Sequence, residues 1–341
     1  MKKLMSLLLA TLMMASVLSG CGNDGGTTPP AASGSGAASS GAAAGATDSL
    51  TFSTGGSQGT YYAFGGVLSQ YVTSNTGMSV TAIESGGSQN NIENLQDGAA
   101  QLGFVQSDVM SYAYEGTNLF AETGAVSDIS TVANLYMEQV QIVTTNPDIK
   151  TVADLKGKNV SIGAAGSGVY YNAIDLLGAY DLTEQDINPT YQGFGDSTDA
   201  LQDGKLDAAF VVAGAPTTAI TSLATAKSVY LVSLDDAHVA KLLETSPYYS
   251  EYTIPAGTYE GLDVDTKTVA VGAVVVARDD VSEQAIYEFV STIFENLDAI
   301  SAQHAKGTEL NVEFAASVTS VPYHPGAAKY FAEKGITVPT K

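Results

Sequence analysis

The chain has 341 residues, a hydrophobic content of 45% and a formal charge of −22, from 36 acidic and 14 basic residues. This length is enough for two ordinary domains, each with a sizeable core. The acidic balance excludes nucleic acid as a partner, because the chain has no basic stripe that would neutralise phosphates. It also argues against binding flat on an anionic membrane surface.

The N-terminal segment predicts export from the cytoplasm. Lys2 and Lys3 precede an apolar run over residues 4–18, which is too short to span a bilayer comfortably. Small residues then lead to Cys21, the only cysteine of the chain. This arrangement resembles the lipobox of bacterial lipoproteins and predicts a signal peptide over residues 1–20, a lipid on Cys21 and an extracytoplasmic, lipid-anchored protein. The alternative is an ordinary secretory signal with a chance cysteine, but no A-x-A cleavage site follows the apolar run.

Residues 21–48 are expected to form a flexible tether, because they are Gly, Ala, Ser, Thr and Pro with almost nothing large. The folded body is expected to start near Ser49. We expect two lobes, the first made of residues 49–140 and 270–341, and the second of residues 141–269.

Two short motifs occur twice in the body, in the same order. Gly59-Thr60-Tyr61-Tyr62 is echoed by Gly168-Val169-Tyr170-Tyr171, and Leu95-Gln96-Asp97-Gly98 by Leu201-Gln202-Asp203-Gly204. The motifs are 36 residues apart in the first copy and 33 in the second, counted from Gly59 to Leu95 and from Gly168 to Leu201. Two echoes in register indicate an internal repeat.

Each copy reads as strand, helix, strand, helix, strand, which predicts parallel sheets with right-handed crossovers. The short second helix of the first copy is expected to start near Asn90, with a capping box between Asn90 and Glu93. In the second copy, residues 193–199 are expected to form a loop. The expected strands are residues 50–53, 79–83, 101–105, 159–162, 189–192 and 206–212, and the expected long helices are residues 61–71 and 170–180. Two apolar, β-branched runs, residues 139–144 and 268–277, suit hinge strands between lobes, and residues 280–304 carry a helical apolar stripe.

Loops rich in glycine and hydroxyl side chains follow the expected strands. Ligands of open parallel sheets bind at the carboxyl ends of the strands, so these loops are expected to line a cleft. The expected fold class is therefore α/β, a two-lobed periplasmic-binding-protein-like (type II) architecture. Each lobe is a mostly parallel sheet with flanking helices, and the ligand cleft lies between the lobes. The loops cover residues 54–59, 85–88, 106–108, 164–168 and 213–216.

The body, from about residue 50 to residue 335, resembles the TAXI-type solute receptors of TRAP (tripartite ATP-independent periplasmic) transporters. The resemblance implies a receptor that delivers an organic acid or acidic amino acid to an ion-coupled membrane subunit, with its large and small parts fused. The chain has Val169 where the family usually has Thr, which removes one hydroxyl. The matching stretches are residues 54–62, 87–91, 105–108, 154–158, 166–168 and 323–328.

The residues expected to bind the ligand come from these loops and from the helices that follow them. Asp108 is suited either to hold a ligand ammonium or to cap the next helix, and Ser88 and Asn91 either to donate to the ligand or to cap their own helix. One tyrosine of each pair is expected in the core and the other in the cleft, unless both lie in the core. The set is Gly56, Ser57, Thr60, Tyr61, Tyr62, Ser88, Asn91, Gln106, Ser107, Asp108, Ser167, Gly168, Val169, Tyr170, Gly214 and Pro216.

A small carboxylate is the expected ligand. The Gly-Ser-Gly loops precede helices, where free N–H groups and the helix dipole bind anions without a basic side chain. Alternatively, the glycines only form tight turns. No lysine lies in these loops, and Arg278, the only arginine, is the alternative basic side chain for the cleft.

The sequence gives little support to an enzyme. The three histidines, His238, His304 and His324, show no metal-ligand spacing, and His324 is expected to fix a turn before Pro325. No nucleophile elbow or P-loop occurs. We therefore expect no catalytic residue, no metal and no cofactor. The alternatives that stay open are a receptor for an ATP-driven importer or a sensor, and an enzyme or adhesin built on this scaffold.

Overall fold

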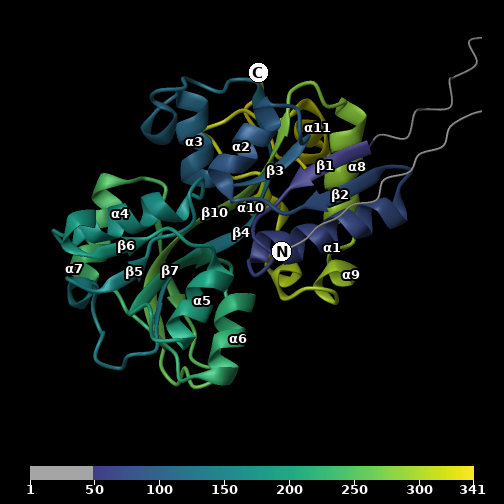
Figure 1. The fold of residues 1–341 in the computed structure, drawn as a ribbon. Helices are drawn as coiled ribbons and strands as arrows, with labels where there is room; N and C mark the ends of the chain where they lie inside the picture. The colour runs from purple at the N-terminus through teal and green to yellow at the C-terminus, as the bar shows by residue number, and fades with distance from the viewer. Residues whose placement is uncertain (1–48) are drawn as a thin grey trace, which may run out of the picture. The chain divides into compact units, whose positions relative to one another are not determined.

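The computed structural model describes residues 49–341, which form one mixed β-sheet flanked by helices (Figure 1). The expected signal peptide, Cys21 and the whole of the expected tether lie outside these residues. Within the described part, no helix has the length and apolar character needed to cross a membrane. The strands are β1 (Ser49–Ser53), β2 (Ser79–Ile83), β3 (Leu102–Gln106), β4 (Ile129–Thr144), β5 (Asn159–Ser161), β6 (Asn188–Thr190), β7 (Ala208–Ala213), β8 (Tyr230–Leu231), β9 (Ser250–Ile254) and β10 (Thr266–Arg278).

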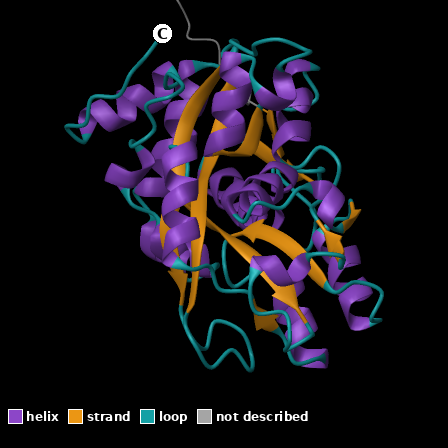
Figure 2. Ribbon diagram, turned by 90° about the vertical axis from the view of Figure 1, so that its left-hand side faces the viewer, coloured by secondary structure: helices purple, strands orange, loops and turns teal. Residues whose placement is uncertain are grey.

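The helices cover both faces of this sheet, and Figure 2 shows them on either side of the long strands. Short 3-10 helices lie at Asn118–Phe120, Val152–Leu155, Glu184–Asp186 and Ala305–Glu309. The α-helices are α1 (Thr60–Asn75), α2 (Ser88–Gln96), α3 (Ser107–Glu115), α4 (Val169–Ala179), α5 (Phe194–Gln202), α6 (Thr218–Ala226), α7 (Asp236–Thr245), α8 (Glu283–Phe294), α9 (Leu297–Ser301), α10 (Val312–Ala315) and α11 (Pro325–Glu333).

The strand order confirms the internal repeat. The sheet runs β2-β1-β3-β10-β4-β7-β5-β6. β1 pairs in parallel with β2 and β3, and β5 pairs in parallel with β6 and β7. Both copies therefore have the same βαβαβ connection, with the first strand at the centre. The repeated Leu-Gln-Asp-Gly motif ends the second helix of each copy, where Gly98 and Gly204 take positive φ angles of 72° and 71°.

Two long antiparallel strands join the two copies. β10 pairs with β3 of the first copy and with β4, and β4 pairs with β7 of the second copy. The apolar runs expected to be hinge strands lie within β4 and β10. The expected fold class is confirmed as α/β, although the parallel strands of both copies belong to one continuous mixed sheet.

The buried apolar residues form separate clusters around the two copies. The largest cluster surrounds β1, β3 and the adjoining parts of β4 and β10, and helices α1, α8 and α11 contribute to it. Around the second copy, alternate residues of β7 face opposite sides: Phe210 and Val212 pack in one cluster, and Ala209 and Val211 in the other. We call the elements around the first cluster the first half, and those around the other two the second half; Figure 1 shows α4 to α7 gathered around β5 to β7.

Several expected boundaries are wrong, and most of the errors concern where helices begin. α2 starts at Ser88 after the N-cap residue Gly87, so the predicted capping box at Asn90 does not form. Asn90 instead accepts a hydrogen bond from the Gly86 N–H at 3.1 Å. α5 starts at Phe194 where a loop was expected, because its buried face is mostly small and polar and gives no apolar period. The stripe over residues 280–304 is two helices, α8 and α9, separated by residues 295–296.

Candidate functional site

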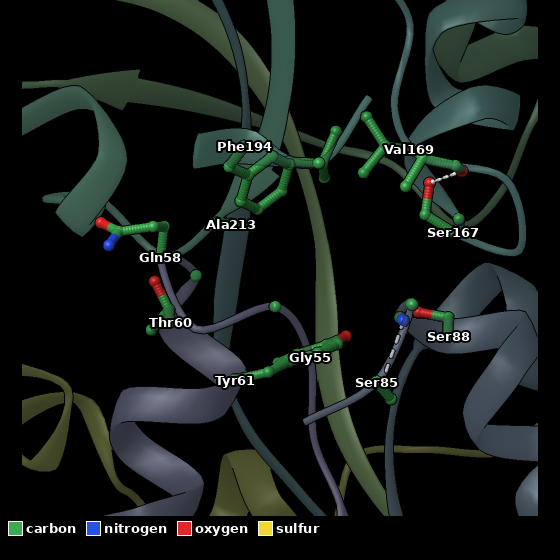
Figure 3. A pocket seen from close by; sticks show the side chains of 18 of the residues that line it. Gly55, Gln58, Thr60, Tyr61, Ser85, Ser88, Ser167, Val169, Phe194 and Ala213 are labelled. Carbon is green, nitrogen blue, oxygen red and sulfur yellow. Dashed lines mark hydrogen bonds between the residues drawn. The ribbon is translucent and has the colours of Figure 1, made fainter. Parts of the chain in front are cut away.

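A cavity of about 260 Å³ opens between the two halves at the carboxyl ends of the parallel strands. Segments of the first half that line it include residues 55–61, 84–88 and Glu138 of β4. Opposite segments include residues 167–169, 193–196 and the end of β7. Figure 3 shows Tyr61 and Ser88 of the first half facing Phe194 and Val169 of the second across this space.

Four helices begin at the cavity, and each of them has a glycine as its N-cap residue. These glycines are Gly59 of α1, Gly87 of α2, Gly168 of α4 and Gly193 of α5, and none can supply a side-chain cap. In the part of the chain that the structure describes, no protein group accepts a hydrogen bond from the N–H of the first residue of these helices. Those first residues all line the cavity and are Thr60, Ser88, Val169 and Phe194.

Among the other α-helices, α7, α8, α10 and α11 have a side-chain cap, whereas α3, α6 and α9 have none. The side chains of Asp235, Asn311 and His324 accept hydrogen bonds at the starts of α7, α10 and α11. The four glycine-capped helices therefore leave unpaired donors and the positive ends of their dipoles at one cavity. Such an arrangement attracts an anion, because N–H groups and helix dipoles stabilise negative charge.

Direct contacts between the two halves surround the cavity. The Thr60 hydroxyl donates to the Gly214 carbonyl at 2.8 Å, and the Asn90 N–H donates to the Gly166 carbonyl at 3.1 Å. The Gln106 amide donates to Asn172 Oδ1 at 3.0 Å. The described structure is thus one in which both halves touch on two sides of the cavity.

Charges around the cavity are all acidic side chains. Glu84, Glu138 and Asp196 line it, and no Lys, Arg or His is among its lining residues within the described part of the chain. Glu84 Oε1 accepts a hydrogen bond from the Ser57 N–H at 2.9 Å, which holds the loop before α1. An anion in this cavity would be bound by backbone and hydroxyl donors rather than by a basic side chain.

Glu138 is the buried member of this group. Its side chain is 2% exposed, and its Oε2 accepts a hydrogen bond from the Tyr61 hydroxyl at 2.7 Å. Burial raises the pKa of the Glu138 carboxyl well above its usual value, although the Tyr61 hydrogen bond and the charge of Lys306 act in the opposite direction. Tyr61 itself stacks on Phe104 with ring centroids 4.6 Å apart, which fixes the hydroxyl toward Glu138.

A buried lysine lies behind the cavity. Lys306 is 2% exposed, its ammonium group pairs with Glu309, and it lies 5.5 Å from the centroid of the Tyr136 ring. Its side chain fills the space beside Gly214, where an added Cβ would lie 2.4 Å from Lys306 Cε. Gly214 therefore makes room for a cation that is close to the cavity without lining it.

The model of the NMT1-like family matches residues 52–335, nearly the whole described body. The chain belongs to the NMT1-like family.

Solved structures share the fold of this NMT1-like protein at low sequence identity. A ligand-binding component of an ABC-type import system from Staphylococcus aureus, solved with zinc bound, is 10% identical with a TM-score of 0.51; the match covers 86% of this chain and 94% of that one. A Bordetella bronchiseptica protein is 14% identical with a TM-score of 0.51, covering 83% and 88%. The periplasmic aliphatic sulphonate binding protein SsuA from Escherichia coli is 18% identical with a TM-score of 0.44, covering 85% and 91%.

Nine of the expected site residues of the NMT1-like protein lie together at the cavity. The Ser167 hydroxyl donates its hydrogen to the Ala164 carbonyl at 2.7 Å rather than to the cavity. Ser88 accepts a hydrogen bond from the Gln106 N–H at 3.1 Å, which links α2 to the end of β3. The nine are Gly56, Ser57, Thr60, Tyr61, Ser88, Gln106, Ser167, Gly168 and Val169.

The other seven expected residues do not line the cavity. Asn91 is fully buried and donates to the carbonyls of Thr54 and Phe104, both at 2.6 Å, so it ties α2 to the sheet. Ser107 accepts a hydrogen bond from the Gly272 N–H at 3.0 Å. Pro216 is exposed and Gly214 is packed against Lys306.

Asp108 neither lines the cavity nor caps α3. It lies in the first turn of that helix, is fully buried, and accepts a hydrogen bond from the Asn172 amide at 2.9 Å. Its other oxygen has no hydrogen-bond partner in the described part of the chain. Burial raises the pKa of Asp108 to about 6.

The tyrosine pairs divide differently from the expectation. Tyr61 is both buried and at the cavity, whereas Tyr62 is 39% exposed on the outer side of α1. Tyr170 donates to Glu184 at 3.0 Å and packs edge to face on Tyr171, away from the cavity lining. Arg278, the alternative basic side chain for the cleft, instead forms an ion pair with Asp280 at 2.6 Å at the end of β10.

Sequence reasoning missed several residues that line the cavity. Glu138 lies in the middle of an apolar strand, and a lone carboxyl in such a run is a signal that was available. Phe194 and Asp196 were assigned to a loop without a role, although Gly193 before them matches the glycine N-caps of the other three helices. Glu84 follows β2 directly, at the carboxyl end of a strand, where loops that line the cleft were expected.

Proposed function

We propose that this NMT1-like protein is an extracytoplasmic solute receptor that binds a small carboxylate and delivers it to a TRAP-type, ion-coupled membrane subunit. The observation that carries the proposal is the convergence of four glycine-capped helix N-termini on one cavity between two halves. Unpaired N–H groups there supply charge-assisted hydrogen bonds to a carboxylate, each worth about 1.5–3 kcal/mol. The cavity volume of about 260 Å³ fits a small metabolite rather than a peptide.

The acidic lining narrows the ligand class. Glu84 and Asp196 would repel a ligand with a large negative charge. A ligand that also carries an ammonium or hydroxyl group would offset this repulsion by donating hydrogen bonds to the two carboxylates. Acidic amino acids and related C4–C5 carboxylates, such as L-glutamate and 2-oxoglutarate, are therefore the first candidates. The described residues that line the cavity include no His, Cys or Lys that would act as nucleophile or base, so we propose a receptor that releases its ligand chemically unchanged.

A second candidate partner is an ATP-driven importer. The ligand-binding component of an ABC-type import system shares this fold, whereas the loops at residues 54–62 and 166–168 resemble those of TAXI receptors. Reconstitution of the receptor with a candidate membrane subunit would separate the two. Uptake driven by an ion gradient without ATP supports a TRAP partner, and uptake that requires ATP supports the alternative.

The ligand proposal is tested on the purified mature protein. Native mass spectrometry would identify a retained solute, and thermal unfolding with L-glutamate, 2-oxoglutarate and succinate would rank added ones, since a ligand that binds only the native state raises its melting temperature. Stabilisation by at least one carboxylate is expected. Binding of neutral or cationic solutes alone would contradict an anion site.

The proposed location depends on Cys21, which lies outside the described residues. Cys21→Ala removes the thiol that carries a lipid anchor, so we expect the variant to be released from membranes or left unprocessed. Fractionation of membranes and soluble material, with mass determination of the product, checks this. A processed variant that still sediments with membranes would show that the anchor is not at Cys21.

A further inference from the structure

Among the described residues, no ion pair joins the buried carboxyl group of Glu138 to a cation, although the charge of Lys306 acts on it. The one buried ammonium nearby, that of Lys306, forms its ion pair with Glu309. The titratable and charged groups that face Glu138 are Tyr61 of α1, Tyr136 of β4, Asp108 of α3 and Lys306 of the 3-10 helix Ala305–Glu309. A carboxylate that is buried without a cation is costly, so the group is expected to keep its proton.

Glu138 also lies beside the start of α1, where the proposed anion is held. Its partner Tyr61 is the second residue of α1, and both Tyr61 and the preceding Thr60 line the same cavity as Glu138. Two carboxylates placed together at this position would repel each other strongly. A neutral carboxyl group beside an anion instead donates a short, strong hydrogen bond to it.

We propose that Glu138 binds the ligand as a protonated carboxyl group, donating its O–H to a carboxylate oxygen of the ligand. The inference rests on the proposed function, because it needs a carboxylate in the cavity. The Tyr61 hydroxyl donates to Glu138 Oε2, so it holds the carboxyl group with the other oxygen available to the ligand. Ligand binding is then coupled to proton occupancy of Glu138, and affinity falls as the pH rises through the pKa of this group.

Three variants separate this role from its alternatives. Glu138→Gln keeps a neutral donor of nearly the same shape, and Glu138→Leu keeps the approximate volume without a donor. Glu313→Gln, on an exposed position of α10, makes the same charge change away from the cavity. Thermal unfolding of each variant shows first whether it is folded.

The measurement is calorimetry with L-glutamate and glutarate, which carry the same two carboxylates and differ by one ammonium group. At about pH 6 we expect Glu138→Gln to bind both probes within about threefold of the wild type, and Glu138→Leu to lose about tenfold or more with both. Toward about pH 9 we expect wild-type affinity to fall while that of Glu138→Gln stays constant. Glu313→Gln should follow the wild type throughout.

Each other result has a defined meaning. If Glu138→Gln loses as much affinity as Glu138→Leu, or if only L-glutamate is affected, Glu138 acts as a carboxylate toward the ammonium group and the inference is overturned. A wild-type affinity that stays flat or rises with pH overturns it as well. If the folded wild type binds neither probe and no other carboxylate, the proposed function itself fails, which is a different result from carboxylate binding that ignores Glu138.

Infrared spectroscopy gives a readout that does not need a ligand. A protonated buried carboxyl group absorbs separately from ionised carboxylates, and the difference spectrum between wild type and Glu138→Gln isolates its band. The band is expected in the wild type near neutral pH. Its absence would show that Glu138 is ionised and would overturn the inference.

Discussion

Gly168 shows how closely the two halves approach at the level of single residues. An added Cβ at this position would lie 1.7 Å from Gln106 Oε1 and 2.8 Å from Val109 Cγ2, both across the boundary between the halves. The sequence placed Gly168 in a Gly-Ser-Gly loop that is expected to bind an anion through backbone N–H groups. The structure adds a steric reason for the glycine, which is that only a glycine lets α4 begin against the side chain of Gln106.

Gly168→Ala is therefore expected to lower carboxylate affinity by about tenfold or more, because the halves cannot close around the ligand as described. Gly56→Ala is the matched control, since Gly56 lines the same cavity and an added Cβ there meets nothing within 4 Å. Its affinity is expected to stay within about threefold of the wild type. Calorimetry with L-glutamate compares the two, and equal losses would contradict a steric role for Gly168.

Single residues of the site were predictable where a turn or a helix start marks them, and less so elsewhere. The glycine before the first tyrosine pair predicted a site at Thr60 and Tyr61, and both residues line the cavity. The sequence could not show which tyrosine of a pair faces inward, because that depends on how α1 rotates against Phe104. Nor could the sequence show that the Asn91 amide donates to the carbonyls of Thr54 and Phe104, since these carbonyls come together only when β1 and β3 pair beside α2.

At the scale of elements, the four helices that begin at the cavity after a glycine lack the side-chain caps that α7, α10 and α11 have. A capping side chain would satisfy the free N–H groups and would occupy the space of an anion. Gly193 is suited to test whether capping a helix competes with anion binding. Its φ and ψ of −66° and 166° suit an N-cap, and an added Cβ meets nothing within 4 Å.

Gly193→Asp is expected to raise the stability of the protein slightly, by about 0.5 kcal/mol, by capping α5. It should lower carboxylate affinity by about tenfold or more, because its carboxylate occupies the donors and repels the ligand. Gly193→Ala is the control that adds a Cβ without a cap or a charge. Thermal unfolding and calorimetry together check the pair, and unchanged binding by Gly193→Asp would show that α5 takes no part in the anion site.

The contact between α3 and α4 carries a pH dependence of its own. Burial raises the pKa of Asp108 to about 6 from its usual 3.8, so the native state holds this proton more tightly than the unfolded state does. Between about pH 4 and pH 6 the native state therefore binds more protons, and stability falls as the pH rises through this window. The shift corresponds to about 3 kcal/mol at most.

Asp108→Asn removes this titration and keeps an oxygen for the Asn172 amide. Its unfolding free energy relative to wild type is expected to rise by up to about 3 kcal/mol from about pH 4 to pH 7. Asp154→Asn is the control, and its unfolding free energy relative to wild type should change with pH in the opposite direction. Hydrogen bonds from the N–H groups of Lys150 and Thr151 lower the pKa of Asp154. Urea unfolding at several pH values measures both, and a difference for Asp108→Asn that does not vary with pH would exclude the proposed shift.

Elements were predicted well where the apolar period is strong and poorly where polar residues are buried. The parallel strands and α1 and α4 follow from their patterns within a few residues. The start of α5 was placed too late because its buried positions include the polar residues Ser197 and Thr198. Ser197 is paired with Ser161 of β5, and the Thr198 hydroxyl donates to the Phe194 carbonyl of its own helix. The start of α3 at Ser107 was likewise read as loop, because Asp108 is polar yet fully buried.

At the scale of the whole described body, β4 and β10 are the strands that connect the two halves through the sheet. The internal repeat predicted two similar βαβαβ units, and the sheet order confirms them. The sequence did not show that the halves share one continuous sheet, because the register between β4 and β10 depends on pairings between residues more than 120 positions apart, such as Gly272 with Met137. Opening and closing would require bending at these two strands, which we expect from a receptor of this kind.

A disulfide across the cavity tests closure directly. An added Cβ at Gly195 of α5 would lie 3.9 Å from Gln58 Cβ, close to the usual separation in a disulfide. The two positions belong to different halves, so Gln58→Cys with Gly195→Cys should form the bond only when the halves are closed, and Cys21→Ala leaves no competing thiol. We expect L-glutamate to speed disulfide formation by shifting the population toward the closed state, and the oxidised protein to exchange ligand more slowly than the reduced one.

Non-reducing electrophoresis against time measures the rate of disulfide formation, and stopped-flow release measures the rate of ligand exchange. Gln58→Cys with Thr245→Cys, which places the second thiol at the end of α7 rather than at the cavity, is the control. Disulfide formation at the same rate with and without every carboxylate tested would mean that ligand binding does not close this protein.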